Sequence, residues 1–147
     1  MAGRRRHVGD LQGEIQELFA ELWQVPRFAG MHRGFRPQVD CYRTDDPPAL
    51  HVVFELPGIE PSSIEVVAGG RALLVSATRE RPDSAAGARY HQMEIDYGHF
   101  QRRIDLAEDV DAAQATASYE HGMLRIELPL AAPGRRGERV QIEVERR

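Results

Sequence analysis

The chain has 147 residues, of which 41% are hydrophobic and 29% are charged, a composition typical of one soluble globular domain. It contains no run of roughly eighteen consecutive apolar residues that would span a membrane, and no apolar signal segment follows its polar start. We therefore expect a cytoplasmic protein without stable membrane insertion. Cys41 is the only cysteine, which excludes an internal disulfide framework, and we expect it to lie half-buried in a strand.

Charge is distributed unevenly along the chain. Residues 1–36 carry a net charge of +2, residues 37–130 carry −8 and residues 131–147 carry +2. An acidic middle repels phosphate, which disfavours nucleic-acid binding by the main domain. We expect the basic flanks to be attracted to the acidic middle of a neighbouring copy.

The N-terminal region, residues 1–36, places many apolar side chains outside any regular sheet. Residues 10–25 have the spacing of an amphipathic helix that ends at Pro26, and residues 27–37 have no regular period. A neighbouring subunit, another protein or a membrane surface could cover this arm, or the helix could dock on its own domain. The side chains predicted to bind clients or neighbouring subunits are Leu11, Ile15, Leu18, Phe19, Leu22, Trp23, Phe28, Met31 and Phe35.

From Val39 onward the apolar period changes to two, which is typical of strands. Turns are expected at Pro57-Gly58, at residues 68–71 and at His121-Gly122, and residues 81–89 form a loop. Together these signals predict an all-β, immunoglobulin-like antiparallel β-sandwich over residues 37–130. The predicted strands cover residues 50–56, 64–66, 71–79, 90–94, 100–106, 115–119 and 124–128.

A C-terminal extension, residues 131–147, follows the predicted sandwich. Its first part is a linker by composition, and Val140, Ile142 and Val144 then form the apolar face of one short strand. An isolated strand cannot bond its own backbone, so it must add to a sheet edge. The linker favours the edge of another copy, and the alternative is that residues 139–145 add to their own sandwich.

Arg102 shares the apolar face of its predicted strand with Phe100, Ile104 and Leu106. A buried guanidinium needs a carboxylate or carbonyl partner, which indicates an interface or an inter-strand ion pair. The alternative is an edge position from which the side chain reaches water.

The sequence contains no motif of nucleophilic catalysis, phosphate binding or metal binding. The six histidines have no metal-ligand spacing, and residues 68–71 lack the helix that a phosphate cradle requires. We therefore assign no catalytic residue, metal or cofactor, and an enzyme is the least favoured class.

Three ordered segments resemble the α-crystallin domain of the small heat shock proteins, bacterial type. They are residues 56–58, residues 97–106 and residues 117–124, and residues 140–142 or 142–144 resemble that family's C-terminal I-x-I/V anchor. The resemblance implies an ATP-independent holdase chaperone that binds partly unfolded proteins. It also implies dimers, formed by exchange of a loop strand, that join into larger homo-oligomers.

The resemblance also assigns roles to individual residues. Arg102, Tyr90 and Met93 fall at the dimer interface, with residues 90–94 as the exchanged strand. The groove that receives the anchor falls at Ile64, Val66, Ala115 and Ala117. Leu106-Ala107 and His121 depart from the usual Leu-Pro and Asn of the family.

Other functions compete with the chaperone. One is an adaptor module like the p23 co-chaperones, which have a similar sandwich and bind one dedicated partner. Another is a membrane-surface role for residues 10–25, which Glu14, Glu17 and Glu21 oppose on anionic lipid.

Overall fold

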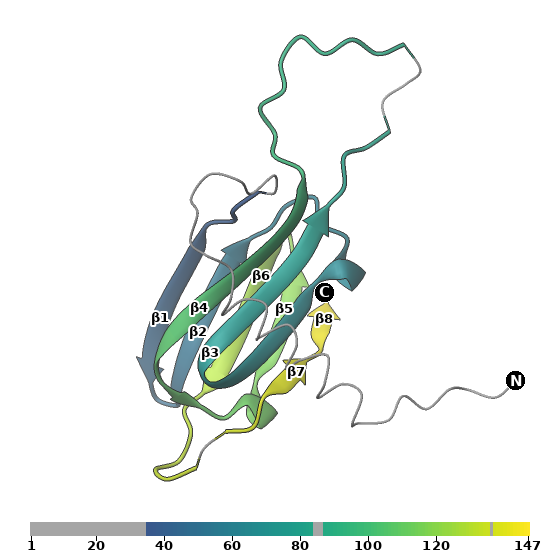
Figure 1. Ribbon diagram of the computed structural model, residues 1–147. Coiled ribbons are helices and arrows are strands. Elements are labelled where there is room, and N and C mark those ends of the chain that lie inside the picture. The colour runs from purple at the N-terminus through teal and green to yellow at the C-terminus, as the bar shows by residue number, and fades with distance from the viewer. Residues whose placement is uncertain (1–34, 84–86, 136) are drawn as a thin grey trace, which may run out of the picture. The chain divides into compact units, whose positions relative to one another are not determined.

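The computed structural model describes residues 35–83, 87–135 and 137–147, which form two stacked β-sheets (Figure 1). The five-stranded sheet has the order β1 (Val39–Asp45), β2 (Pro48–Glu55), β6 (Met123–Pro129), β5 (Thr116–Glu120) and β8 (Val144–Arg146). The three-stranded sheet has the order β4 (Gly98–Val110), β3 (Glu65–Arg79) and β7 (Val140–Ile142). The short 3₁₀ helices are η1 (Pro61–Ser63) and η2 (Ala112–Gln114).

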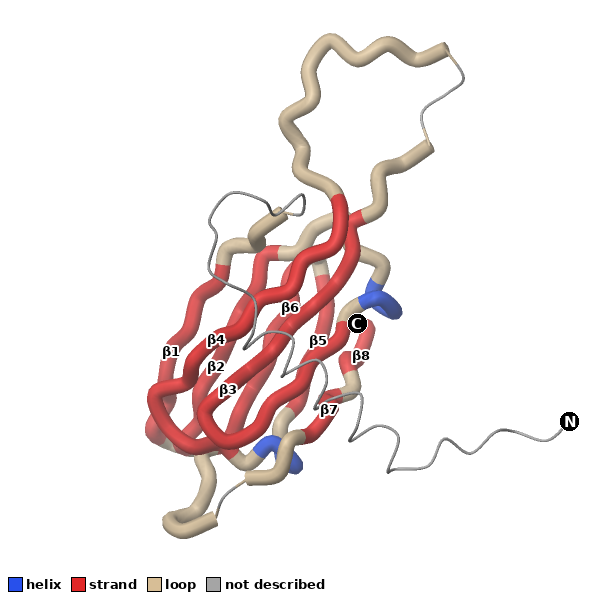
Figure 2. The backbone as a smooth tube through the Cα atoms, viewed as in Figure 1, coloured by secondary structure: helices blue, strands red, loops and turns tan. Residues whose placement is uncertain are grey.

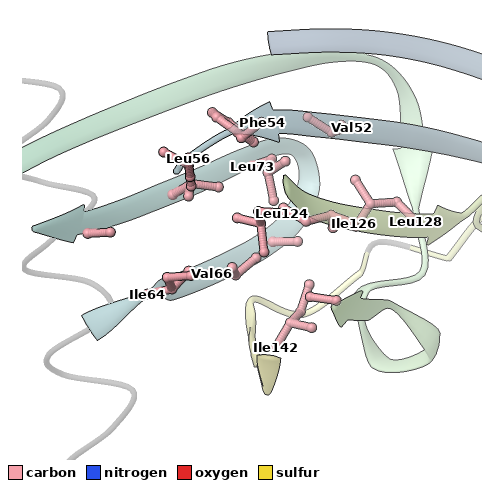
Figure 3. Close-up of a cluster of buried hydrophobic side chains, with 14 of the residues drawn as sticks. Val52, Phe54, Leu56, Ile64, Val66, Leu73, Leu124, Ile126, Leu128 and Ile142 are labelled. Carbon is pink, nitrogen blue, oxygen red and sulfur yellow. The ribbon is translucent and has the colours of Figure 1, made fainter. Parts of the chain in front are cut away.

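The core lies between the two sheets, and its residues follow the alternation of the sequence. In β2, Val52 and Phe54 are fully buried whereas Glu55 is exposed, because successive side chains of a strand point to opposite faces. The predicted all-β antiparallel sandwich is therefore confirmed. Figure 3 shows the central cluster, and the largest fully buried side chains are Val52, Phe54, Leu56, Val66, Leu73, Val75, Val110, Leu124, Ile126 and Leu128.

A two-residue turn joins β5 to β6, as the His121-Gly122 pair predicts. Glu120 pairs with Met123 across it, and both turn residues have positive φ, 51° for His121 and 74° for Gly122. This backbone matches the twist of the two strands. The turn also packs on Pro57, because a Cβ added at Gly122 would lie 3.0 Å from the Cα of Pro57.

β3 contains most of two segments that the sequence predicts as separate strands, residues 64–66 and 71–79. Figure 2 shows this long strand turning back on itself. The register with β4 is irregular between Gly70, at φ 58°, and Ala72. Residues 66–68 pair with β7, whereas Gly70 and residues 72–79 pair with β4. The turn expected at residues 68–71 therefore lies within β3.

The loop between β3 and β4, residues 80–97, projects beyond the end of both sheets (Figure 1). Its described residues form no strand, so the strand predicted over residues 90–94 is wrong for the single chain. The physical reason is that no sheet edge lies alongside this segment to bond its backbone. Tyr90, Met93 and Ile95 are 52%, 60% and 63% exposed.

Two expectations about individual residues are corrected by the structure. Cys41 lies in a strand as expected, but it is exposed, because β1 is an outer strand whose residues are mostly exposed. Phe35 is buried in the core of its own sandwich, where its ring meets that of Phe100 edge-on at 5.0 Å. It is therefore not part of an uncovered arm.

Candidate functional site

The C-terminal tail covers the same side of both sheets. β7 lies at the edge of the three-stranded sheet beside β3, and β8 lies at the edge of the five-stranded sheet beside β5. We call the space between β3 and β5 that holds the tail the strand groove. Figure 1 shows β7 and β8 following each other along it.

The tail pairs antiparallel with a strand of one sheet and parallel with a strand of the other. β7 runs antiparallel to β3, with Ile142 opposite Val66 and Val140 opposite Ala68. β8 runs parallel to β5, with Val144 opposite Ala117. One extended segment thus adds a strand to each sheet in turn, and its backbone groups pair as those of an added strand do.

The predicted anchor and the predicted groove come together in the structure. Ile142, which belongs to both overlapping anchor motifs, is buried in the core cluster (Figure 3). Val140 and Val144 are partly buried against this cluster. The groove side chains Ile64, Val66 and Ala117 are buried, and Ala115 packs against them in part. Ile142 is therefore the central apolar contact of the tail.

The groove holds the tail of its own chain. This is the alternative in which residues 139–145 add to their own sandwich, and the structure describes a single chain. Capture of the tail by another copy stays a prediction.

Gly69 and Gly137 permit a close backbone approach that the sequence analysis missed. A Cβ at Gly69 would lie 2.9 Å from the Cα of Arg139, and one at Gly137 would lie 2.9 Å from the carbonyl oxygen of Val110. A real Cβ does not approach backbone atoms so closely, so a larger side chain would move the tail. The Gly69-Gly70 pair gave a local signal for a turn but none for this contact.

Tyr119 supports the β5 wall of the groove. Its side chain is buried, and its hydroxyl donates a hydrogen bond of 2.6 Å to the carbonyl oxygen of Leu56. The amide of Arg147 donates to the carbonyl oxygen of Tyr119 at 3.2 Å, which holds the end of the tail on β5.

Arg102 is partly buried, and its Nη1 donates a 2.6 Å hydrogen bond to the carbonyl oxygen of Pro37. Burial lowers the pKa of the Arg102 guanidinium, and the positive charge of Arg36 lowers it further. Within the described residues a carbonyl is its partner, and the expected inter-strand ion pair is absent. Its place at a dimer interface stays a prediction.

The structure describes both loop residues predicted at the dimer interface but only one of the predicted arm residues. Tyr90 and Met93 are exposed on the loop, and the sequence analysis missed Ile95 beside them. Of the predicted arm contacts, only Phe35 lies in the described part. The remaining arm side chains, with the predicted helix over residues 10–25, lie outside it: Leu11, Ile15, Leu18, Phe19, Leu22, Trp23, Phe28 and Met31.

Neither a metal cluster nor a membrane-spanning helix occurs in the part of the chain that the structure describes. No group of three or more His, Cys, Asp or Glu side chains there is placed to hold a metal ion. No helix in the same residues has the length and apolar character needed to cross a membrane.

A sandwich that holds an extended segment across the edges of its two sheets is a strand-binding module. The model of the Hsp20/alpha crystallin family matches residues 43–145, which include most of the sandwich and the tail. The chain therefore belongs to this family, the small heat shock proteins, and membership supports a chaperone role.

Individual relatives agree with this assignment. Small heat shock protein C2 of Rickettsia felis is 28% identical over 132 residues, 90% of this chain and 82% of the relative. The 16.9 kDa class I heat shock protein 1 of Triticum aestivum is 33% identical over 135 residues, 82% of this chain and 87% of the relative. A solved small heat-shock protein of Xylella fastidiosa, described as having a distinct high order structure, is 33% identical with a TM-score of 0.57, covering 71% of this chain and 95% of that one.

Proposed function

We propose that this protein is an ATP-independent holdase that binds partly unfolded proteins and prevents their aggregation. The observation that carries the proposal is the strand groove, occupied by a short apolar segment, in a member of the small heat shock protein family. Such a segment can leave and return without any chemical step. Burial of one Ile side chain contributes about 1.5–3 kcal/mol, which suits a reversible contact.

Dimers form, in this proposal, by exchange of the loop between β3 and β4. The loop carries the exposed apolar side chains Tyr90, Met93 and Ile95, which gain cover when another chain pairs with residues 90–94. β1 is the outermost strand of the five-stranded sheet, so its far edge is suited to receive that segment.

Larger assemblies form when the tail occupies the groove of a neighbouring subunit. The same backbone pairing serves both cases, because the groove does not depend on which chain supplies the strand. Dilution or heat then releases tails and arms, and their apolar side chains bind unfolding clients by the hydrophobic effect.

The decisive experiment heats a model enzyme with the purified chain and follows light scattering without nucleotide. We expect the full chain to suppress aggregation. A variant lacking residues 1–34 keeps Phe35 in the core, and we expect it to fold but to protect much less.

Full protection by this shortened chain would contradict the arm as the client-binding region. Absence of protection by the full chain, together with a fixed monomeric or dimeric mass, would contradict the holdase and support the adaptor function.

A further inference from the structure

Arg79 lies at the C-terminal end of β3, where its side chain contacts three separate segments. Its Nε donates to the carbonyl oxygen of Pro57 at 2.9 Å, and its Nη1 donates to the carbonyl oxygen of Asp96 at 3.1 Å. Its guanidinium carbon lies 4.1 Å from the centre of the Phe35 ring. One side chain thus joins parts of the chain that are far apart in sequence.

Two of the three segments belong to regions that the proposed assembly uses, the N-terminal region and the 80–97 loop. Phe35 lies at the end of the N-terminal region, Asp96 lies at the end of the 80–97 loop just before β4, and Pro57 lies in the turn after β2. The arm root, which we define as residues 35–38, is also held by the hydrogen bond from the Glu55 amide to the carbonyl oxygen of Gln38.

Only an arginine can make this set of contacts at once. Its planar guanidinium offers donors in a fixed fork and a flat face that stacks on an aromatic ring. The next arginine reinforces the loop side, because the guanidinium of Arg81 lies 4.4 Å from the ring centre of Tyr97. A movement of the Asp96 carbonyl therefore changes the position of the same group that covers Phe35.

We propose that Arg79 is a positioning residue that couples the arm root to the 80–97 loop. Withdrawal of the loop towards a partner subunit removes one acceptor from Arg79 and loosens its contact with Phe35. The coupling is reciprocal, so a change at Phe35 loosens the loop. This proposal rests on the proposed dimer formation through that loop.

The test measures the two ends of the coupling separately in the full chain, at a dilution at which native mass measurement shows single chains, because the proposed exchange withdraws the loop in dimers. Cleavage by a glutamate-specific protease after Glu94 reports on the loop, and hydrogen exchange of the Glu55 amide reports on the arm root. For Arg79→Gln we expect both to accelerate, with Glu55 exchange about two- to fivefold faster, the size expected for losing one cation–π contact.

Arg71→Gln is the matched control. Arg71 lies on the same strand, is 64% exposed, and has an ion pair of 3.3 Å with Asp109. We expect this variant to leave both measurements unchanged. Equal acceleration by Arg71→Gln would overturn the proposal, because loss of any β3 arginine would then suffice.

Phe35→Leu tests the coupling itself. Leucine keeps an apolar side chain in the core but removes the ring below Arg79, and we expect faster cleavage after Glu94 on the distant loop. Unchanged cleavage in this variant would overturn the proposal, since Arg79 would then hold each segment independently.

Arg79→Lys keeps the charge and a donor without the planar face. Compared with Arg79→Gln, we expect this variant to show slower cleavage after Glu94 but little slowing of Glu55 amide exchange. If both rates returned to those of the unmodified chain, the proposed need for a guanidinium would be overturned. If Arg79→Gln does not fold, the rates of cleavage after Glu94 and of Glu55 amide exchange in Arg79→Lys test the coupling instead. Neither measurement requires a client or a partner subunit, so the result is separable from success or failure of the holdase assay.

Discussion

Gly122 combines a backbone requirement with a close contact. Its φ of 74° is unfavourable for other L-residues, and a Cβ there would meet the Cα of Pro57 at 3.0 Å. We expect Gly122→Ala to lower the free energy of unfolding by about 2 kcal/mol or more, since the left-handed conformation alone costs about 1–2 kcal/mol. Urea unfolding followed by circular dichroism measures this change.

Gly134→Ala provides the comparison. Gly134 has a φ of 83°, but a Cβ there would meet no atom within 4 Å, so only the backbone cost applies. We expect the loss at Gly122 to be clearly larger than the loss at Gly134. Equal losses would mean that packing of the turn on Pro57 contributes nothing.

Ile142 is the residue on which the tail contact depends. We expect Ile142→Glu to reduce the mass of the assembled particle, because a carboxylate cannot occupy the apolar groove without a partner. Gln141→Glu adds the same charge one residue earlier on an exposed side chain, and we expect it to leave the mass unchanged. Multi-angle light scattering measures both, and an unchanged mass for Ile142→Glu would exclude the tail as a link between subunits.

Among the elements, β8 offers a direct way to find which chain supplies the tail. Ser118 lies opposite Glu145 in the parallel pair of β5 and β8, and both line one hollow on the outer face of the sheet. Neighbouring positions of this kind suit a disulfide. We expect Ser118→Cys with Glu145→Cys, in a Cys41→Ser background, to form a bridge within one chain at high dilution and between chains in concentrated samples.

Electrophoresis without reducing agent separates these products. A band of single-chain mass at every concentration would contradict assembly through the tail. Failure to form a bridge at any concentration would contradict the register of β8 on β5.

The strands were accessible to prediction because alternation reveals which side of a strand is buried. In β6, Leu124, Ile126 and Leu128 alternate with exposed residues, and the structure buries all three. Alternation does not reveal which edge a strand joins. The change of the tail from β3 to β5, and its parallel pairing there, therefore could not be derived from the sequence.

The site was predictable only where local motifs carry information. Ile142 was found because it is shared by two anchor motifs, and its groove was found by resemblance to the family. Gly69 and Arg79 were missed, because their contacts with Arg139 and Phe35 connect residues that are distant in sequence and leave no local pattern. The strand predicted over residues 90–94 is absent from the single chain because no sheet edge lies beside it, and its pairing with another chain stays a prediction.

For the whole molecule, assembly and protection should change together with temperature. We expect native mass measurements to show smaller species on heating, and client capture to rise over the same interval, because both depend on release of apolar segments. Protection that rises while the mass distribution stays constant would contradict a mechanism based on dissociation.

The hydrogen bond between the Arg147 amide and Tyr119 has a practical consequence for producing this protein. Because Arg146 pairs with Tyr119 and β5 ends at Glu120, an affinity tag fused after Arg147 would start at the end of the strand groove, beside the His121-Gly122 turn. Such a tag would add its own backbone and side chains beside the tail contact that the Ile142 and cysteine variants test, so recombinant material for these assays is best purified without one.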